Sequence, residues 1–368
     1  MFKLKNYIEL NPKEHISKGE IVRQVTMADL EPFNRDIKKC GYVKYKSGTK
    51  FRNGDTLLAR ITPCLENGKT SFVNFLKQNE VAVGSTEFYV LRAIEGKMDP
   101  NYLYYLSISK KFRKSLIKSM TGTSGRQRAT KEAVLDYDSN IPDFDNQKSI
   151  SHKLSLIDDM ISVNNQINDN LDDLLTLIFE KFAINMKFEK SNLVGIANFK
   201  NGLPMQKFQC EKFENGIPVL KIRELSQGYT DSSSDRCSMK INKDYIVKTG
   251  DIVFSWSGTL MVKIWSGTTS GLNQHLFKVT SKKFPSWFIY EWTKHYLKKF
   301  KLIAAGKATT MGHIKRSDLM DSVVFIPNYK FLSQLTKIMK PIYDERIKII
   351  KQNQHLNCLK KEFLTKYF

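Results

Sequence analysis

The chain has no long apolar run and no apolar segment at its start. No stretch approaches the roughly 18 consecutive apolar residues expected of a transmembrane helix. The opening segment Met1–Asn6 also lacks the apolar core of a secretory signal. The sequence therefore favours neither membrane insertion nor export, and we expect a cytoplasmic protein.

Cysteine is scarce, with five residues in a chain of 368. The five lie far apart, at Cys40, Cys64, Cys210, Cys237 and Cys358. Their number is odd, and their spacing matches neither a zinc site nor a redox motif. We expect them to be reduced thiols.

The motifs of the common catalytic sites are also missing. The sequence contains no GxxxxGK[ST] phosphate loop, no HExxH metal motif and no Asn-Pro-Pro-aromatic segment of an amino-group methyltransferase. Its histidines are scattered and are predicted to be structural or solvated: His15, His152, His275, His295, His313 and His355. We therefore expect this chain to have no catalytic residues, no metal site and no cofactor of its own.

One segment, residues 142–148, superficially resembles the metal site of a nuclease because it combines Pro-Asp with a later lysine. It stands directly before a long helical pattern. There Asp143 or Asp145 can accept hydrogen bonds from free backbone N–H groups, and Pro142 can end the preceding element. A helix cap is the favoured interpretation.

Acidic residues are few compared with basic ones. Fifty-nine Lys and Arg against 37 Asp and Glu give a formal net charge of +22. Such an excess favours a polyanionic partner, because cations that neutralise phosphates release counterions. Nucleic acid is the first candidate, and a general compositional bias towards lysine is the alternative.

The positive feature of the sequence is a duplication. Ile141-Pro142 recurs as Ile326-Pro327, 185 residues later (326 − 141), and an apolar pattern follows each pair. The first helix supplies Ile150, Leu154, Ile157, Leu171, Leu174, Ile178 and Phe182. At the same offset the second supplies Leu335, Met339, Ile342, Leu356, Leu359, Phe363 and Tyr367. A period of half the chain indicates a duplicated domain.

Both patterns alternate steps of four and three, from residue 150 to 182 and from 335 to 367, which is typical of a coiled-coil seam. Asn164 and Asn168 interrupt the first seam. Arg346, Asn353 and Lys360 interrupt the second, where Leu359 could supply apolar cover.

Antiparallel pairing would set Asn164 opposite Asn353. A helix of this length spans roughly 48 Å, or about 14 base pairs, and could act as a spacer. A helical hairpin or a homodimer interface are the alternatives.

The remaining sequence reads as two globules with short strands. Strands are predicted at Tyr42–Tyr45, Thr56–Ile61 and Glu87–Leu91. Residues 100–120 predict one amphipathic helix or a close pair, whose basic face carries Lys110, Lys111, Arg113, Lys114 and Lys118.

The second half repeats this plan. Gly54-Asp55 returns as Gly250-Asp251, Glu87–Val90 as His275–Lys278, and the helical segment as Trp287–Phe300. The fold class is predicted to be α+β: two mixed α/β globules with an internal pseudo-twofold duplication, joined by two long antiparallel coiled-coil helices. The predicted boundaries are 1–145 and 188–328 for the globules, and 146–187 and 329–368 for the helices.

Two polar segments, 121–131 and 305–316, precede the Ile-Pro pairs and combine glycines with side chains that can pair with base edges. A second set follows the predicted strands near residues 60 and 256. The candidate DNA-binding residues are Arg60, Lys69, Arg126, Gln127, Arg128, Lys131, Ser257, Thr259, Lys263, Lys307, His313, Lys315 and Arg316. Contact with phosphates alone is the alternative for each.

This layout resembles the specificity subunit of type I restriction-modification enzymes. The resemblance covers essentially the whole chain. Its marks are the repeated Gly-Asp, the segments Arg60–Lys69 (RITPCLENGK) and Ile314–Leu319 (IKRSDL), and the Ile-Pro before each helix. Many members open the helix with Glu-Gln, where this chain has Asn146-Gln147 and Ser333-Gln334.

The resemblance implies a non-catalytic, bacterial or archaeal subunit with two target-recognition domains that read a bipartite, asymmetric site in double-stranded DNA. It also implies assembly with two modification subunits and with restriction subunits, which methylate adenine or cleave DNA. S-adenosylmethionine, ATP and Mg²⁺ would belong to those partners. The alternatives are a stand-alone DNA- or RNA-binding protein, which should show no large apolar patch on the paired helices, and a nuclease.

Overall fold

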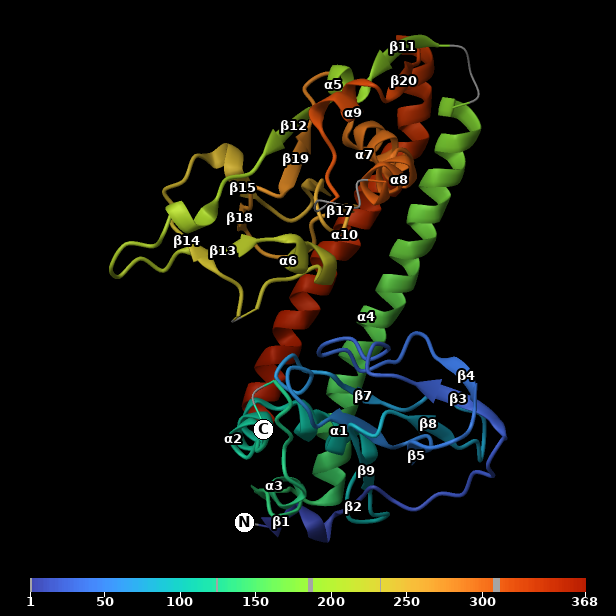
Figure 1. The fold of residues 1–368 in the computed structure, drawn as a ribbon, viewed down its shortest axis with the longest axis vertical. Coiled ribbons are helices and arrows are strands. Elements are labelled where there is room, and N and C mark those ends of the chain that lie inside the picture. Colours follow the sequence, from blue (N-terminus) through green and yellow to red (C-terminus); the bar gives the residue numbers. More distant parts are fainter. Residues whose placement is uncertain (1, 124, 185–187, 232, 307–311) are drawn as a thin grey trace. The chain divides into compact units, whose positions relative to one another are not determined.

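The computed structural model describes residues 2–123, 125–184, 188–231, 233–306 and 312–368. The chain forms two compact units (Figure 1). Unit 1 comprises Met1–Ser162 with Leu356–Phe368, and unit 2 comprises Val163–His355. Both mix helices and strands, as predicted.

Unit 1 contains two four-stranded sheets and one strand pair. The first sheet has the order β2 (Ile8–Leu10), β9 (Phe88–Ala93), β6 (Thr56–Ala59), β7 (Thr70–Phe72). The second has the order β4 (Gly41–Lys44), β3 (Ile21–Val25), β8 (Ala82–Gly84), β5 (Thr49–Phe51), with β3 and β8 parallel. The pair is β1 (Phe2–Lys3) with β10 (Asp138–Ser139). The helices are η1 (Leu4–Asn6), α1 (Pro100–Ile108), α2 (Lys110–Lys118) and α3 (Lys131–Leu135).

Unit 2 repeats this strand order. Its first sheet is β12 (Asn198–Asn201), β19 (Leu276–Thr280), β16 (Ile252–Ser255), β17 (Met261–Ile264). Its second is β14 (Arg236–Cys237), β13 (Ile217–Leu220), β18 (Ser270–Leu272), β15 (Ile246–Val247), with β13 and β18 parallel. The pair is β11 (Glu189–Asn192) with β20 (Val323–Ile326). The helices are α5 (Leu193–Ile196), η3 (Met205–Lys207), α6 (Ile222–Gln227), η4 (Lys243–Tyr245), α7 (Ser286–His295), α8 (Leu297–Ala305) and α9 (Arg316–Met320).

The repeated Gly-Asp forms the same turn in both units. Gly54 and Gly250 have φ angles of +89° and +95°, a region that glycine adopts without strain. Each following aspartate accepts a backbone N–H three residues back: Asp55 from Arg52 at 2.8 Å and Asp251 from Lys248 at 2.7 Å. The duplication is therefore conserved in turn chemistry as well as in strand order.

Residues 100–120 form the predicted close pair of helices. Ser109 lies between them, and its hydroxyl accepts the N–H of Phe112 at the start of α2. The prediction that Arg113 lies on a basic face was wrong. Its guanidinium is buried, donates to the carbonyls of Leu65 and Glu66 at 2.6 and 3.0 Å, and lies 4.5 Å from the ring centroid of Phe33.

Two long helices follow the Ile-Pro pairs, α4 (Phe144–Phe179) and α10 (Tyr329–Tyr367). The first long helix was expected to span residues 146–187. Instead α4 passes into the π-helix η2 (Glu180–Ile184), and residues 185–187 lie outside the described chain. The start of α4 is capped as predicted, because Asp143 accepts the backbone N–H of Asn146 at 2.9 Å. These hydrogen bonds from Asn146 also lower the pKa of Asp143.

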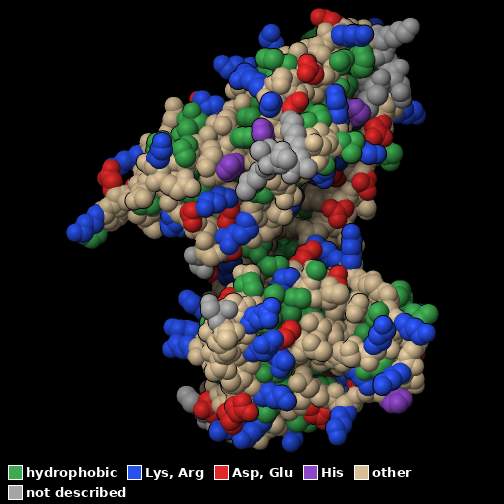
Figure 2. Space-filling model, viewed as in Figure 1, with side chains coloured by type: hydrophobic (Ala, Val, Ile, Leu, Met, Phe, Trp, Pro, Cys, Tyr) green, Lys and Arg blue, Asp and Glu red, His purple; other side chains and the backbone are tan. Residues whose placement is uncertain are grey.

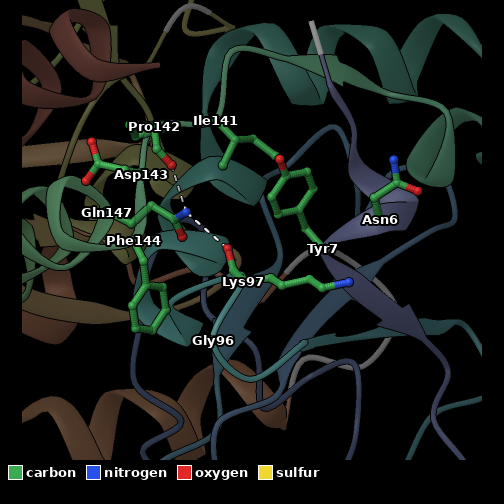
Figure 3. A pocket seen from close by; sticks show the side chains of 9 residues that line it. All are labelled: Asn6, Tyr7, Gly96, Lys97, Ile141, Pro142, Asp143, Phe144 and Gln147. Atoms are coloured by element: carbon green, nitrogen blue, oxygen red, sulfur yellow. Dashed lines mark hydrogen bonds between the residues drawn. The ribbon is translucent and has the colours of Figure 1, made fainter.

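The glutamine that opens α4 ties the helix to the globule of unit 1. Gln147 is 1% exposed, and its Nε2 donates to the carbonyls of Lys97 and Pro142 at 3.1 and 2.9 Å (Figure 3). Its Oε1 accepts the N–H of Asp99 at the N-terminus of α1. A shallow pocket beside this contact is lined by Asn6, Tyr7, Gly96, Lys97, Ile141, Pro142, Asp143, Phe144 and Gln147 (Figure 3). Gln334, near the start of α10, is exposed, so the second repeat lacks an equivalent buried glutamine at this position.

Four of the five polar residues that interrupt the seams have partners within one unit, while Oδ1 of Asn168 is buried without a hydrogen-bond partner among the described residues. In unit 1, Lys360 of α10 donates to Asp158 of α4 at 2.6 Å, and Tyr105 of α1 donates to the same carboxylate at 2.8 Å. Lys360 is buried while Leu359 is 38% exposed, so the prediction that Leu359 covers this position was wrong. The buried ion pair makes apolar cover unnecessary there.

In unit 2, Asn164 of α4 donates to Asn353 of α10 at 2.8 Å, which is the contact expected of antiparallel pairing. Asn353 also donates to Asn165 at 3.0 Å. Further along, Arg346 of α10 and Asp172 of α4 form an ion pair at 2.6 Å. The asparagine contacts satisfy hydrogen-bonding groups that would be costly to bury alone, whereas Nε of Arg346 is buried without a hydrogen-bond partner among the described residues.

A buried carboxyl of unit 2 faces the same helices. Glu291 of α7 is 1% exposed, and its Oε2 accepts the hydroxyl of Thr176 at 3.3 Å, while its Oε1 has no hydrogen-bond partner among the described residues. Burial raises the pKa of Glu291 to about 7, against the opposing effect of Lys294. The folded state therefore binds a proton that an unfolded chain releases at lower pH.

Because the folded-state pKa is the higher one, the protonated carboxyl stabilises unit 2 below pH 4.5, and this stability is lost as pH rises through 7. We expect the wild-type free energy of unfolding to fall relative to that of Glu291→Gln by about 2.5 kcal/mol between about pH 5 and pH 8. Urea unfolding at both pH values, followed by tryptophan fluorescence, measures this difference. Parallel pH profiles for the two proteins would contradict it.

Candidate nucleic-acid interface

Three distant segments of unit 1 meet at one half-exposed ionic cluster. Glu87, just before β9, accepts from both Arg60, just after β6, and Arg128 in the polar segment before α3. The closest nitrogen–oxygen distances are 3.3 Å to Arg60 and 2.6 Å to Arg128. Hydrogen bonding from Arg128, followed by the charges of both arginines, lowers the pKa of Glu87. The cluster therefore keeps its ionised form at neutral pH.

A backbone framework holds these segments together. Arg60 donates its N–H to the carbonyl of Glu87 at 3.0 Å, and Ala129 donates to the carbonyl of Arg60 at 2.8 Å. Ile61 and Arg128 form an isolated antiparallel bridge. The buried hydroxyl of Tyr89 fixes the same strand end by donating to the carbonyl of Ala129 at 2.8 Å. The three charged side chains thus stand on a rigid support.

The same framework occurs in unit 2 with other side chains. Trp256 donates its N–H to the carbonyl of His275 at 3.3 Å, and Ile314 donates to the carbonyl of Trp256 at 2.8 Å. Ser257 and His313 form the corresponding antiparallel bridge. Residues 256, 275 and 313 therefore occupy the positions of 60, 87 and 128. We call these two sets the unit 1 junction and the unit 2 junction.

The unit 2 junction is aromatic. The ring of Trp256 lies 6.0 Å from that of His275 and 6.3 Å from that of His313, measured between centroids. Its indole N–H donates to Asn201 at 3.0 Å, and Nδ1 of His275 is 2.9 Å from the hydroxyl of Ser257. Two neighbouring supports thus fix the rings in place.

The other candidates divide by exposure. Arg126, Lys131, Thr259, Lys315 and Arg316 have exposed side chains, and Gln127 is half-buried. Lys131 and Arg316 are the first residues of the equivalent short helices α3 and α9, so each junction has a cation on the same neighbouring element. Lys307 lies outside the described residues.

Three candidates have structural partners. Nζ of Lys69 donates to the carbonyl of Met27 at 2.5 Å, and Nζ of Lys263 donates to that of Ser226 at 2.6 Å. Ser257 is buried. These partners favour a supporting role for all three over direct contact with DNA.

Positive charge is distributed widely. Figure 2 shows Lys and Arg side chains spread over the drawn face of both units, without one dominant patch. Charge density alone therefore does not locate an interface, and the junctions with their neighbouring cations are the best-defined candidates.

Other site chemistry is missing from the described part of the chain. It has no cluster of His, Cys, Asp or Glu suited to a metal ion. The cysteines are free thiols. None of its helices combines the length and apolar character needed to cross a bilayer.

Sequence reasoning missed Glu87 and His275 as members of a site. A sequence signal was present, since the two segments were recognised as repeats of each other and each of the two residues stands directly before a strand. The missing information was the meeting of Glu87 with Arg128, which lies 41 residues away in sequence. Glu87 and Arg128 come into contact only in the folded chain.

A second exposed feature is an apolar stripe on α4. Within unit 2, Val163, Ile167, Leu174 and Leu177 are 40–64% exposed. Leu156 and Met160 on the same helix in unit 1 are 48% and 47% exposed. These positions follow heptad spacing one residue before the buried seam, so they form a separate face of the helix, which we call the α4 stripe. Asn170 occupies the remaining position of this spacing. A row of exposed apolar side chains on one helix face is typical of a protein-binding surface.

Comparison with known proteins gives a consistent family. Residues 2–173 and 185–357 each match the model of the type I restriction modification DNA specificity domain. The two matches cover both repeats and most of the chain.

Individual relatives match over shorter parts of their length. The type I restriction enzyme EcoAI specificity subunit of Escherichia coli is 35% identical over 128 residues, which are 33% of this chain and 21% of that protein. The MjaIX specificity subunit of Methanocaldococcus jannaschii is 25% identical over 290 residues, 71% of this chain and 65% of that protein. The crystal structure of a type I restriction-modification S subunit from M. genitalium shares the fold, with a TM-score of 0.50, 15% identity, and coverage of 100% of this chain and 95% of that one.

Proposed function

This chain belongs to the type I restriction-modification DNA specificity domain family, and we propose that it is the DNA-specificity subunit of such a complex. Each unit would read one half of a bipartite, asymmetric site in double-stranded DNA. The chain itself would be non-catalytic. Modification subunits would methylate adenine within the site, and restriction subunits would cleave the DNA.

The α4 stripe is the observation that carries the proposal. A stand-alone DNA- or RNA-binding protein has no use for a row of exposed Val, Ile and Leu side chains along a long helix. A subunit that docks on partner proteins does, because removing apolar surface from water favours association. The stripe therefore supports assembly with modification subunits.

DNA recognition is proposed at the two junctions and the polar segments beside them. Arg60, Arg128 and the exposed Arg126 and Lys131 would face DNA from unit 1. His313, Thr259, Lys315 and Arg316 would do so from unit 2. Cations at the rim would contact phosphates and set the register, while side chains at the junctions would contact base edges.

The long helices are proposed to pair antiparallel and set the gap between half-sites. Within unit 2, residue numbers that rise along α4 meet numbers that fall along α10, as in 164 with 353 and 172 with 346. Under this proposal the recognition domains are residues 1–145 and 188–328. The segments 146–187 and 329–368, which include most of α4 and all of α10, would connect them as a spacer with pseudo-twofold symmetry.

A polar pair in an apolar seam fixes register at a cost in stability. We expect Asn164→Leu with Asn353→Leu to keep unit 2 folded and to broaden the alignment of α4 against α10. Spin labels placed by Asp169→Cys and Lys351→Cys, in a background without other reactive cysteines, report the interhelical distance. If the distance distribution of the Leu variant is as narrow as that of the wild type, the two amides do not fix the register.

Cofactors are assigned to the partners. S-adenosylmethionine would bind the modification subunits, and ATP and Mg²⁺ would bind the restriction subunits. The described residues contain no metal-ligand cluster that would argue for a site in this chain.

An assembly experiment tests the proposal. The purified chain, the modification subunits encoded beside it, and their mixture are each incubated with DNA and labelled S-adenosylmethionine. Methyl transfer by the mixture alone is expected. Methyl transfer by the chain alone would contradict a non-catalytic role, and equal transfer without the chain would contradict a specificity role.

A further inference from the structure

We propose that the two junctions hold the specificity-determining side chains, and that Arg128 reads a guanine in the half-site of unit 1. This inference rests on the proposed function, because it assigns the base contact of a DNA reader. Glu87 is assigned as the positioning residue for Arg128.

The two junctions share one backbone framework. Both junctions keep the same two backbone hydrogen bonds and the same antiparallel bridge, with donor–acceptor distances between 2.8 and 3.3 Å. The framework is therefore independent of which side chains stand on it. Two units that recognise different half-sites need different side chains, and here those side chains stand on the same backbone framework.

The guanidinium of Arg128 has more donors than the described residues use. Its side chain is 43% exposed. Nε and Nη2 donate to Glu87, and Nη1 donates to the carbonyl of Arg126 at 3.2 Å. A guanidinium carries five N–H groups. Three therefore have acceptors among the described residues, and one N–H on each Nη remains.

Two neighbouring N–H groups on a planar fork match the O6 and N7 acceptors of guanine in the major groove. Arginine normally loses conformational entropy when it makes such a contact. Here Glu87 and the carbonyl of Arg126 already fix the fork, so less entropy remains to be lost. Arg128 is thus prepared for bidentate recognition before DNA binds.

The unit 2 junction carries different side chains at these positions. The equivalent of Arg128 is His313, and the equivalents of Arg60 and Glu87 are Trp256 and His275. None of these offers a forked pair of donors. The half-site of unit 2 should therefore lack a preference for guanine at the equivalent base, and the complete site should be asymmetric there.

The test maps methylated adenines in cells that express the modification subunits with variants of the full chain. Arg128→Ala should reduce discrimination for guanine at one position of one half-site by about 10- to 100-fold, the range of a good bidentate contact. Arg128→Lys keeps the charge and loses the fork, so it should also lose this preference. His313→Ala should change only the other half-site, and Lys114→Ala, an exposed cation on α2, should change neither.

Glu87→Ala tests positioning. It should weaken discrimination for the same guanine while the preferred base stays the same, whereas a purely structural defect would lower methylation at all sites equally. An unchanged motif in Arg128→Ala and Arg128→Lys would overturn the inference, and so would a uniform loss with a shallower salt dependence, which identifies a phosphate contact. Absence of methylation with the wild-type chain would instead overturn the proposed function.

Discussion

Replacing Lys360 with methionine is expected to destabilise unit 1 by about 3–5 kcal/mol, because it leaves a buried carboxylate without its cation. The Lys360 and Asp158 side chains are 9% and 8% exposed, and their charged atoms lie 2.6 Å apart. The hydroxyl of Tyr105 also donates to Asp158. Hydrogen exchange of α1 and the end of α10 would measure the loss in unit 1 itself.

Two controls separate the ion pair from general effects on the helix. Lys361→Met changes the exposed neighbouring lysine and should alter stability by less than about 0.5 kcal/mol. Asp158→Leu combined with Lys360→Met removes both charges and should recover most of the loss. Equal stability of Lys360→Met and wild type would show that this pair contributes nothing to the attachment of α10 in unit 1.

The second large effect is expected at the α4 stripe. Ile167→Lys with Leu174→Lys places two charges where we propose that a modification subunit docks. Central apolar contacts typically contribute 2 kcal/mol or more each, so affinity should fall by about 1,000-fold or more. Both side chains are exposed in the free chain, so its stability should stay within about 1 kcal/mol of wild type.

A matched variant controls for charge. Gln166→Lys with Asp169→Asn gives the same charge increase at exposed polar positions of α4 outside the stripe. It should bind modification subunits with the wild-type affinity. Surface plasmon resonance measures this affinity for both variants. If both variants bind equally well, the α4 stripe is not the docking surface.

The periodic features of the structure were predictable from sequence. The steps of four and three predicted the two long helices, because an apolar seam repeats in sequence wherever two helices pack along their length. The Asn164–Asn353 contact followed from centring one seam on the other. The repeated Gly-Asp turn was also recognisable, because it requires glycine at a positive φ.

Features that depend on distant partners were not predictable. Arg113 was expected on a solvated basic face, but it is buried against the carbonyls of Leu65 and Glu66, 47 or 48 residues earlier. Lys360 was expected to be a defect in the seam, and its partner Asp158 lies 202 residues away. A Lys or Arg side chain is predicted to be exposed unless a buried partner is known. The local sequence pattern does not identify a partner that is distant in sequence.

The candidate site shows the same limit. The polar segments before each Ile-Pro pair contain Arg128 and His313 of the junctions, but the pairing of Arg128 with Glu87 depends on the sheet that brings β9 beside β6. The α4 stripe was not predicted, because each of its positions lies one residue before a position of the seam, and the apolar pattern was assigned to the seam alone. Separating the two faces required the exposure of each side chain.

The most direct test of the specificity role is a genome-wide map of methylated adenines in cells that express the modification subunits with and without this chain. We predict one bipartite motif with a fixed gap, present only when the chain is expressed. Methylation at the same sites in its absence, or no methylation while the purified chain binds DNA or RNA alone, would contradict the role of a specificity subunit.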